Sequence, residues 1–304
     1  MNIANLDLNL LVALRALLEE RNVTRAGERI GLSQPATSAA LGRLRRHFCD
    51  ELLVRRGNHY ELTPLGHALR APAANACSVM ERLFSSRAHF HPGTEERDFT
   101  LLASDYAVTV FGARLARVLH EQAPGLRLHF RQLPDTIVEA TDSVLGSVDG
   151  AFILHGVISG YPAVELYRDE WVCLVDSGNR TVGEEITMAD LARLPWAVYQ
   201  RPYDTPVAHQ FGMLGQEPRV EVSVQNFRML PELVRGTRRV ALVQRRLAEA
   251  VGDADLRVLP CPFPAAPVRE ALWWHPVHRD DAAHIWLRET AARVAAGLDP
   301  SRER

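Results

Sequence analysis

The residues with the most distinctive spacing lie in segment 32–48, LSQPATSAALGRLRRHF. Small uncharged hydrogen-bonding side chains stand at its start, and arginines stand at its end. A helix whose first turn enters the major groove of DNA reads base edges with such side chains, while cations further along hold phosphates. The candidates for base contacts are Ser33, Gln34, Pro35, Thr37 and Ser38.

The side chains of this segment suit such contacts chemically. Gln34 can form paired hydrogen bonds with adenine, the hydroxyls can donate or accept at base edges, and Thr37 offers a methyl group to thymine. The alternative is that Ser33 and Pro35 only start a helix, while the arginines form a solvated face. The arginines placed for contact with the DNA backbone are Arg43, Arg45, Arg46, Arg55 and Arg56.

Apolar periodicity predicts the helices that position these residues. A first helix covers residues 8–20, where leucines and Val12 recur on one face. Asn22 is the N-cap of a second helix, and Gly31 ends it. Ser33 then caps a third helix, with Ala40, Leu41, Leu44 and Phe48 facing inward. A helix, a short glycine turn and another helix form the pattern of a helix-turn-helix.

A predicted hairpin follows the third helix. Strand-like runs at 52–55 and 60–62 flank Gly57-Asn58, a strong hairpin signal. Thr63-Pro64 then starts a long helix that extends to about residue 90. Segment 89–96, HFHPGTEE, carries proline, glycine and charge and is the predicted domain boundary. The hairpin favours a DNA-binding role, because a module that only dimerises has no need of it.

Beyond the boundary, strands and helices alternate. Three strands with helices at 106–122 and 136–145 between them indicate a parallel sheet with right-handed crossovers. A second set of strands follows, and a last strand and a helix over 284–296 complete the chain. The predicted strands cover 99–103, 126–130, 150–154, 171–175, 196–199, 220–224, 240–243 and 269–275.

Composition excludes several classes of protein. The 304 residues allow two or three domains, and the four cysteines show no CxxC spacing. Reduced thiols in a cytoplasmic protein therefore fit better than a disulfide framework or a zinc site. No apolar run reaches 18 residues, so no membrane span is expected, and the N-terminus does not read as a signal peptide.

The charge is unevenly distributed along the chain. The net charge is −2. Residues 1–92 contain 12 arginines and 8 acidic residues, a balance of +4, and residues 93–304 contain 23 arginines and 29 acidic residues, a balance of −6. A mildly basic N-terminal third suits a polyanionic partner.

Catalytic and metal-binding motifs are absent from the sequence. It has no GxSxG, GxxxxGK[ST], GxGxxG or HExxH pattern, so no enzymatic activity and no cofactor are expected. The histidines lack a cysteine or carboxylate at a recognised ligand spacing, and a metal site is not expected. The histidines considered are His89, His91, His275, His278 and His284.

Together these motifs resemble the LysR-type transcriptional regulators. The resemblance rests on NVTRAGERIGLSQPATSAALGRLRRHF and on the LLVRRGNHYELTPLG wing. Downstream, SDYAVTVFGARLARVLHEQAPGLRLHF, VDGAFIL and ALWWHPVHRDDAAHIWLRE resemble the branch of nodulation-gene regulators and aromatic-acid-responsive activators. One departure is that Ala39 and Ala40 stand where many members carry longer polar residues.

The resemblance implies an α/β fold in three parts. These are a winged helix-turn-helix at 1–63, a linker helix at 64–92 that dimerises, and a periplasmic-binding-protein-like effector domain at 93–304. Lobe I of that domain covers about 93–165 and 270–304, and lobe II covers about 166–269. The implied partners are double-stranded promoter DNA, a small-molecule effector, RNA polymerase and further copies of the chain as a homodimer or homotetramer.

The effector site is expected between the lobes. Ligands of α/β sheets bind at the carboxyl ends of strands, which selects Ser104, Asp105 and Tyr106. The charge of Asp105 opposes an anion unless it acts as a cap, so a neutral phenol, an amine and an aromatic acid are all alternatives. The competing interpretation is an enzyme or solute-binding domain whose N-terminal helices only dimerise it. The resemblance adds Tyr199, Gln200, Asn226, Phe227 and Trp273 as effector contacts.

Overall fold

The computed structural model describes residues 7–57, 59–85, 90–200, 203, 206–215 and 217–298. The chain forms two compact units, Met1–Ser86 and Arg87–Arg304, which we call the N-terminal unit and the C-terminal unit. Within the described ranges, no helix has both the length and the apolar character needed to span a lipid bilayer.

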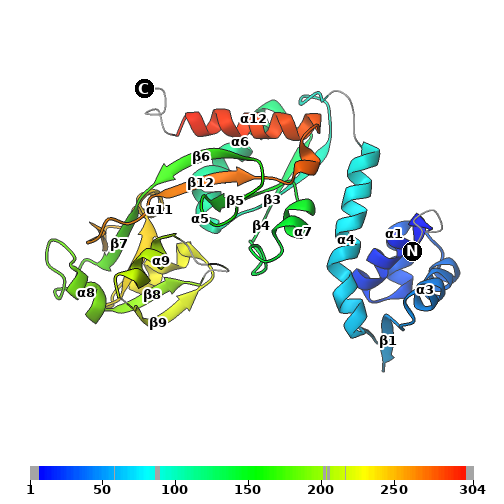
Figure 1. Cartoon of the computed structure of the whole chain (residues 1–304), viewed down its shortest axis with the longest axis horizontal. Helices are drawn as coiled ribbons and strands as arrows, with labels where there is room; N and C mark the ends of the chain where they lie inside the picture. Colours follow the sequence, from blue (N-terminus) through cyan, green and yellow to red (C-terminus); the bar gives the residue numbers. More distant parts are fainter. Residues whose placement is uncertain are drawn as a thin grey trace. The chain divides into compact units, whose positions relative to one another are not determined.

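Three helices form the body of the N-terminal unit: α1 (Leu8–Glu20), α2 (Val23–Ile30) and α3 (Gln34–Phe48) (Figure 1). Asn22 Oδ1 accepts from the Arg25 backbone N–H at 3.0 Å, and Gly31 ends α2 with a φ of 70°. The predicted caps of α2 and α3 are therefore confirmed. The core of the unit contains Leu14, Leu17, Leu18, Leu41 and Leu44.

A hairpin and a long helix complete the unit. Strands β1 (Leu53–Arg56) and β2 (His59–Leu62) pair antiparallel, as predicted, and Asn58 at their turn lies outside the described residues. Helix α4 (Pro64–Ser85) begins where Thr63 Oγ1 accepts from the Gly66 N–H at 3.0 Å. The helix packs against α1 within the same unit.

Two five-stranded sheets form the C-terminal unit (Figure 1). The first has the order β4-β3-β5-β12-β6, and the second has the order β11-β7-β10-β8-β9. Strand β3 is parallel to β4 and β5, which confirms the predicted parallel pairing, and β12 is antiparallel to its neighbours. Strands of the first sheet are β3 (Arg97–Leu102), β4 (Leu126–Arg131), β5 (Gly150–Leu154), β6 (Ala163–Asp169) and β12 (Val268–Trp273); those of the second are β7 (Trp171–Asp176), β8 (Pro195–Tyr199), β9 (Arg219–Val224), β10 (Val240–Gln244) and β11 (Leu256–Pro260).

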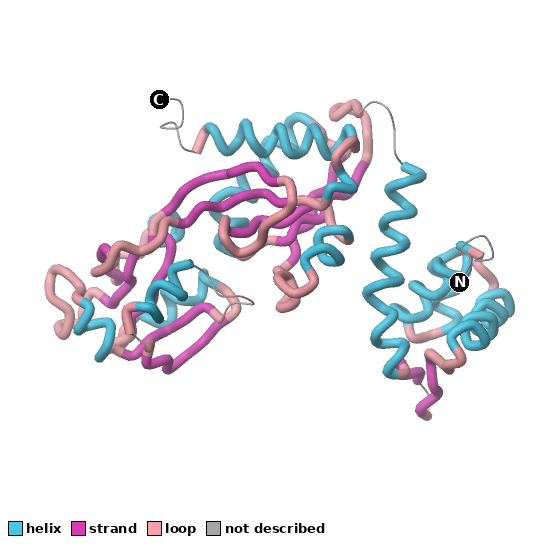
Figure 2. The backbone as a smooth tube through the Cα atoms, in the orientation of Figure 1, coloured by secondary structure: helices cyan, strands magenta, loops and turns pink. Residues whose placement is uncertain are grey.

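Helices cover both faces of these sheets (Figure 2). Side chains of α6 (Ala113–Gln122) and α12 (Ala282–Ala296) join one large core cluster that extends from the first sheet to the second. Helix α7 (Thr141–Gly146) packs on the opposite face of the first sheet, in a smaller cluster. The helices of the second sheet are α8 (Met188–Arg193), α9 (Pro206–Met213), α10 (Leu230–Val234) and α11 (Arg245–Val251).

The observed elements differ from the predicted ones in several places. Strands β6 and β11 were not predicted, and the helix predicted over 136–145 begins only at Thr141, after a series of turns. The helix predicted over 106–122 is divided into α5 (Asp105–Ala107), the π-helical turn η2 (Val108–Gly112) and α6. The lobe limits predicted near 166 and 270 fall inside strands β6 and β12. The chain leaves the first sheet only after Asp169 and returns to it before Val268.

Candidate functional site

The first turn of α3 presents an exposed, uncharged surface. Gln34, Pro35 and Ser38 are exposed there, together with Ser33 just before the helix. The Ser33 hydroxyl accepts from the Ala36 N–H at 3.4 Å, so this residue caps α3 while its side chain stays accessible. The turn therefore offers hydrogen-bonding groups to a partner without presenting a charge.

Thr37 does not belong to this surface. Its side chain has no exposed area, and its hydroxyl donates to the Ser33 carbonyl at 3.0 Å. The side chain lies against Gly27 of α2, where an added Cβ would come within 2.7 Å of Thr37 Oγ1. The prediction that Thr37 contacts bases is wrong, because its side chain is used in the contact between α2 and α3.

Two arginines of α3 are bound to groups of the protein itself. Arg43 pairs with Asp7, the N-cap of α1, at 3.0 Å. Arg45 donates to the carbonyls of Glu51 and Leu53 at 2.9 and 2.8 Å and pairs with the Glu51 carboxylate. Arg45 thus attaches the hairpin to α3, and Arg43 must leave Asp7 to bind a phosphate.

The other three candidate arginines are exposed. Arg56 lies 3.5 Å from the Glu61 carboxylate, and Arg55 Nε donates to the Gly57 carbonyl at 3.2 Å. Among the described residues, no carboxylate pairs with Arg46 or Arg55. These two side chains are the cations most available to a DNA backbone.

In the C-terminal unit, the first strand-helix junction is capped twice. The Ser104 hydroxyl accepts from the Ala107 N–H at 3.2 Å at the start of α5. The Asp105 carboxylate accepts from the backbone N–H groups of Phe227 and Arg228, at 3.0 and 2.8 Å, at the start of the 3-10 turn η3 (Phe227–Met229). Asp105 therefore acts as a cap that joins the two halves of the unit.

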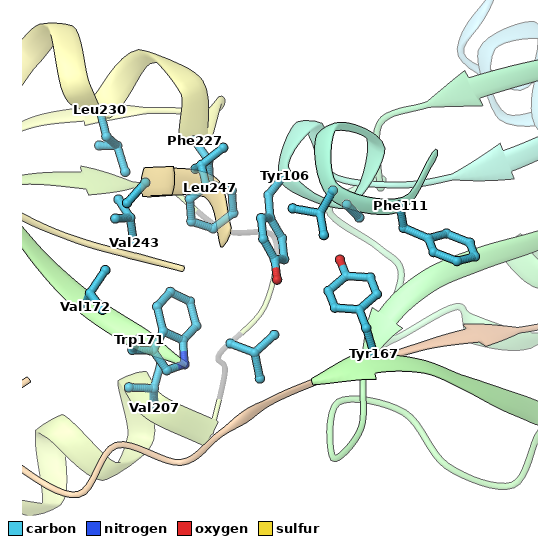
Figure 3. Close-up of a cluster of buried hydrophobic side chains, with 14 of the residues drawn as sticks. Tyr106, Phe111, Tyr167, Trp171, Val172, Val207, Phe227, Leu230, Val243 and Leu247 are labelled. Atoms are coloured by element: carbon cyan, nitrogen blue, oxygen red, sulfur yellow. The ribbon is translucent and has the colours of Figure 1, made fainter. Parts of the chain in front are cut away.

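A buried network lies beside this junction (Figure 3). The Tyr106 hydroxyl donates to Asp169 Oδ2 at 2.8 Å, and the rings of Tyr106 and Tyr167 meet edge to face with centroids 6.1 Å apart. Burial raises the pKa of Asp169 and holds the pKa of Tyr106 well above its ordinary value. Tyr106 thus joins α5 to the point where the chain passes from one sheet to the other.

Two cavities lie near the junction at residues 104–106. A cavity of about 30 Å³ lies between the sheets, and one of about 260 Å³ lies on the second sheet beside α9. Tyr199 and Tyr203 line both cavities. The Tyr199 ring stacks on Phe227 with centroids 3.9 Å apart and planes inclined by 15°. The small cavity is lined by Ser104, Tyr106, Phe152, Leu154, Trp171, Tyr199, Tyr203, Phe227, Gln244 and Glu270.

Four of the eight predicted effector contacts therefore line one cavity: Ser104, Tyr106, Tyr199 and Phe227. Asp105 caps η3 instead, and Asn226 Oδ1 accepts from the Arg228 N–H at 3.1 Å. Gln200 is exposed, and its backbone N–H donates to the Val224 carbonyl. Gln200 and Asn226 are absent from the linings of both cavities.

Trp273 is not a wall of this cavity. Its indole N–H donates to the Ile153 carbonyl at 3.0 Å, and the side chain lies in the cluster beside α7. Side chains of a strand alternate between its two faces, so Glu270 and Leu272 face the large core while Trp273 faces the other side. Trp273 therefore lines neither cavity, and its contact with an effector stays a prediction.

Sequence reasoning missed Glu270 and Gln244. Glu270 is 3% exposed, and burial together with the charge of Asp169 raises its pKa to about 8. The available signal was a single carboxylate inside the apolar strand VREALW, since buried carboxylates are rare and concentrate at functional sites.

Three of the histidines considered as metal ligands bond to other protein groups. His278 Nε2 lies 2.9 Å from the Val148 carbonyl and His284 Nε2 lies 2.6 Å from the Asp149 carbonyl. His275 Nε2 lies 3.1 Å from Asp142, and His89 lies outside the described residues. Burial lowers the pKa of His284 to about 3, so its ring is neutral and holds the end of α12 to β5.

These features define a class: a winged helix-turn-helix joined to an α/β domain with a cavity between its two sheets. The family description "Bacterial regulatory helix-turn-helix protein, lysR family" matches residues 8–67, and "LysR substrate binding domain" matches residues 92–296. The chain belongs to the LysR family of transcriptional regulators.

Similar proteins extend over nearly the whole chain. Nodulation protein D 2 of Rhizobium tropici is 32% identical over 97% of this chain and 95% of its own length. Nodulation protein D 1 of Mesorhizobium japonicum is 33% identical over 98% and 96%. Among solved structures, a "probable transcriptional regulator" of Pseudomonas aeruginosa is 28% identical, with a TM-score of 0.71 over 95% of this chain and 97% of its own.

Proposed function

We propose that the protein binds promoter DNA through the first turn of α3, and that a small molecule held between the two sheets of the C-terminal unit controls transcription. The observation that carries the proposal is the exposed, uncharged turn at Gln34 and Ser38, flanked by Arg46 and by Arg55 of the hairpin. Such a surface combines base-reading groups with cations for phosphates. Transcriptional control implies contact with RNA polymerase in the cytoplasm and requires no catalysis by the chain itself.

Exposed apolar side chains support a homodimer or homotetramer. Leu8 and Val12 of α1 are 50% and 41% exposed, and Val79 and Phe84 of α4 are 43% and 80% exposed. Exposed apolar side chains on neighbouring helices are typical of an interaction surface. A second copy of α4 would bury part of this surface and place two α3 helices on one DNA site.

The proposal is tested by binding of the purified protein to the DNA upstream of its own gene and to a scrambled duplex, at two salt concentrations. Tighter binding to the native duplex, weakening steeply with salt, is the expected result. Equal binding to both duplexes would contradict sequence-specific binding to that region. A search of genomic fragments for bound sites then decides whether the operator lies elsewhere.

The Gln34→Ala variant is expected to lose specific affinity by roughly 1–3 kcal/mol, because the paired hydrogen bonds to a base edge are lost. Binding to the scrambled duplex is expected to remain nearly unchanged, since Gln34 carries no charge. Fluorescence anisotropy on both duplexes measures the two effects. Equal losses on both DNAs would reject the base-reading role of Gln34.

The Arg55→Ala variant is expected to bind all sequences more weakly and to reduce the salt slope by about one unit, because one phosphate contact is removed. The matched control is Arg114→Ala on α6, an exposed arginine of the C-terminal unit that removes the same charge. The control should keep the wild-type slope. A changed sequence preference in Arg55→Ala would show that the hairpin reads bases instead.

A further inference from the structure

Glu270 lines the small cavity between the sheets. It belongs to β12, where it pairs with Leu154 of β5 and Tyr167 of β6. The residue is 3% exposed, and no hydrogen-bond donor among the described residues bonds to its carboxyl group. A carboxylate in such a place costs free energy unless a partner compensates for the lost water.

A second polar group of this cavity also lacks a partner. Gln244 Oε1 is buried and forms no hydrogen bond. Gln244 lines the same cavity as Glu270, from the end of β10. An amide oxygen only accepts hydrogen bonds, and an ionised carboxylate does the same. Gln244 Oε1 therefore needs a donor, and the Glu270 carboxylate needs one once it is ionised.

The charge that acts on Glu270 comes from a buried carboxylate. Asp169 acts electrostatically on Glu270 and raises its pKa. Arg246 gives its backbone N–H to Asp169 and its charge lowers the pKa of that carboxyl group, but no arginine or histidine of the described residues lines the cavity. The rest of the lining is largely aromatic, from Tyr106, Trp171 and Phe227 (Figure 3).

From these contacts we propose that the cavity between the sheets binds the ammonium group of an organic amine, with Glu270 as its counter-ion. An ammonium group donates up to three hydrogen bonds and is attracted to the faces of aromatic rings. It would satisfy Glu270 and Gln244 together, whereas an aromatic acid would place its carboxylate near the buried Asp169 and beside the acceptor Gln244 Oε1. The inference rests on the proposed function, because it names the chemical class of the effector for the same site.

The neighbouring cavity fits the body of such a ligand. Its 260 Å³ are lined mainly by apolar and aromatic side chains, among them Trp196, Val207 and Phe211. The small cavity, at about 30 Å³, holds little more than a water-sized group. Since Tyr199 and Tyr203 line both spaces, an aryl or alkyl body can occupy the larger one while its ammonium group enters the smaller.

Binding of an amine is coupled to the release of a proton from Glu270. Without a ligand the raised pKa of Glu270, about 8, keeps its carboxyl group protonated at pH 7. An ammonium group favours the ionised form, so its binding at pH 7 is expected to release about one proton from the protein. Asp169, Tyr106 and Tyr167 are the other titratable groups around Glu270, and none of them pairs with it directly.

Three probes of one shape test the inference: 2-phenylethylamine, 2-phenylethanol and phenylacetate. Calorimetric titration of the full-length protein at pH 7, in buffers of different ionisation enthalpy, measures affinity and proton release. The amine is expected to bind at least about tenfold more tightly than the alcohol, and the acid more weakly than both. Only the amine is expected to show a buffer-dependent enthalpy.

The Glu270→Gln variant keeps the shape of the side chain but cannot ionise. It is expected to lose the preference for the amine and the proton release, while its affinity for the alcohol stays within about twofold. The control Glu139→Gln changes an exposed carboxylate and should behave as the wild type. Thermal unfolding at pH 8.5 tests whether the Glu270→Gln variant is folded. The variant is expected to be at least as stable as the wild type at this pH, because its uncharged amide avoids the cost of ionising a buried acid.

An amine that binds no better than the alcohol, an unchanged preference in Glu270→Gln, or no binding of any probe would overturn the inference. Operator binding is measured on the same samples. Retained specific DNA binding without an amine preference would reject only the inference about the ligand. Loss of specific DNA binding by the wild type would reject the proposed function whatever the probes do.

Discussion

Replacing Arg97 with methionine is expected to lower the free energy of unfolding of the C-terminal unit by about 3 kcal/mol, because two partly buried carboxylates lose their cation. Arg97 donates to both oxygens of Asp281 at 2.7 Å and lies 3.4 Å from Asp149. Asp281 is also the N-cap of α12, and Asp149 accepts from the Thr100 N–H at 2.8 Å. The guanidinium therefore holds β3, the start of β5 and α12 together.

Denaturant unfolding at pH 7 measures the change, and Arg127→Met is the matched control. Arg127 pairs with a single aspartate, Asp98, and both side chains are more than half exposed. Solvent screens such a pair, so the control is expected to change stability by less than about 1 kcal/mol. Equal losses in the two variants would show that the Arg97 pair contributes no more than a surface ion pair.

The effect of Arg97 is expected to depend on pH. Burial works against the charge of Asp281, but the hydrogen bonds and charge of Arg97 outweigh it and keep the pKa of Asp281 below its ordinary value of 3.8. A lowered pKa in the folded state contributes stability that is present above that ordinary value and is lost as the pH falls through the folded-state pKa. The gap between wild type and Arg97→Met should therefore narrow below pH 3.8.

Replacing Gly27 with alanine is expected to destabilise the N-terminal unit by about 1–3 kcal/mol and to weaken specific DNA binding. A Cβ at this position would come within 2.7 Å of both the Leu32 carbonyl oxygen and Thr37 Oγ1. Either α2 or the start of α3 must then shift, and that shift moves Gln34 relative to the hairpin. The loss overrides the gain in helix propensity that alanine brings.

Gly42→Ala is the control for this variant. Gly42 lies in α3, and a Cβ there would meet only Arg46 Nη1, at 3.8 Å. The control should be neutral or more stable by up to about 1 kcal/mol, because alanine favours a helix. Thermal unfolding and operator binding, measured on both variants, test whether the close contact at Gly27 is needed for stability and for DNA binding. A stable Gly27→Ala protein with wild-type DNA binding would show that α2 and α3 can separate without consequence.

Local signals were sufficient for the helix-turn-helix. Asn22, Gly31 and Ser33 cap or end their helices as predicted, because capping depends on side chains within three residues of the backbone groups they satisfy. The apolar positions of α1 and α3 are buried for a similar reason, since the period of a helix decides which residues share a face.

The parallel strands were also predictable. Runs such as GAFIL are short, apolar and bounded by glycine or a charged residue, which identifies a buried strand. Strand β6 was missed because AVELYRD mixes charges with apolar residues as it crosses toward the second sheet. Its pairing with β12 joins residues about 100 positions apart, and a local pattern carries no signal for such pairing.

Sequence alone thus determined the local elements, their caps and, through the resemblance, the class of regulator. The tertiary structure decided which side chains remain available for contact with DNA or with a ligand. Thr37 has the composition of a base-reading residue, but the contact with Gly27 buries it. Glu270 is a single carboxylate in an apolar strand, and only the packing of β10 and β12 brings it into one cavity with Gln244. Burial and the pairing of distant groups arise from packing between elements, and the order of residues along one element does not contain that information.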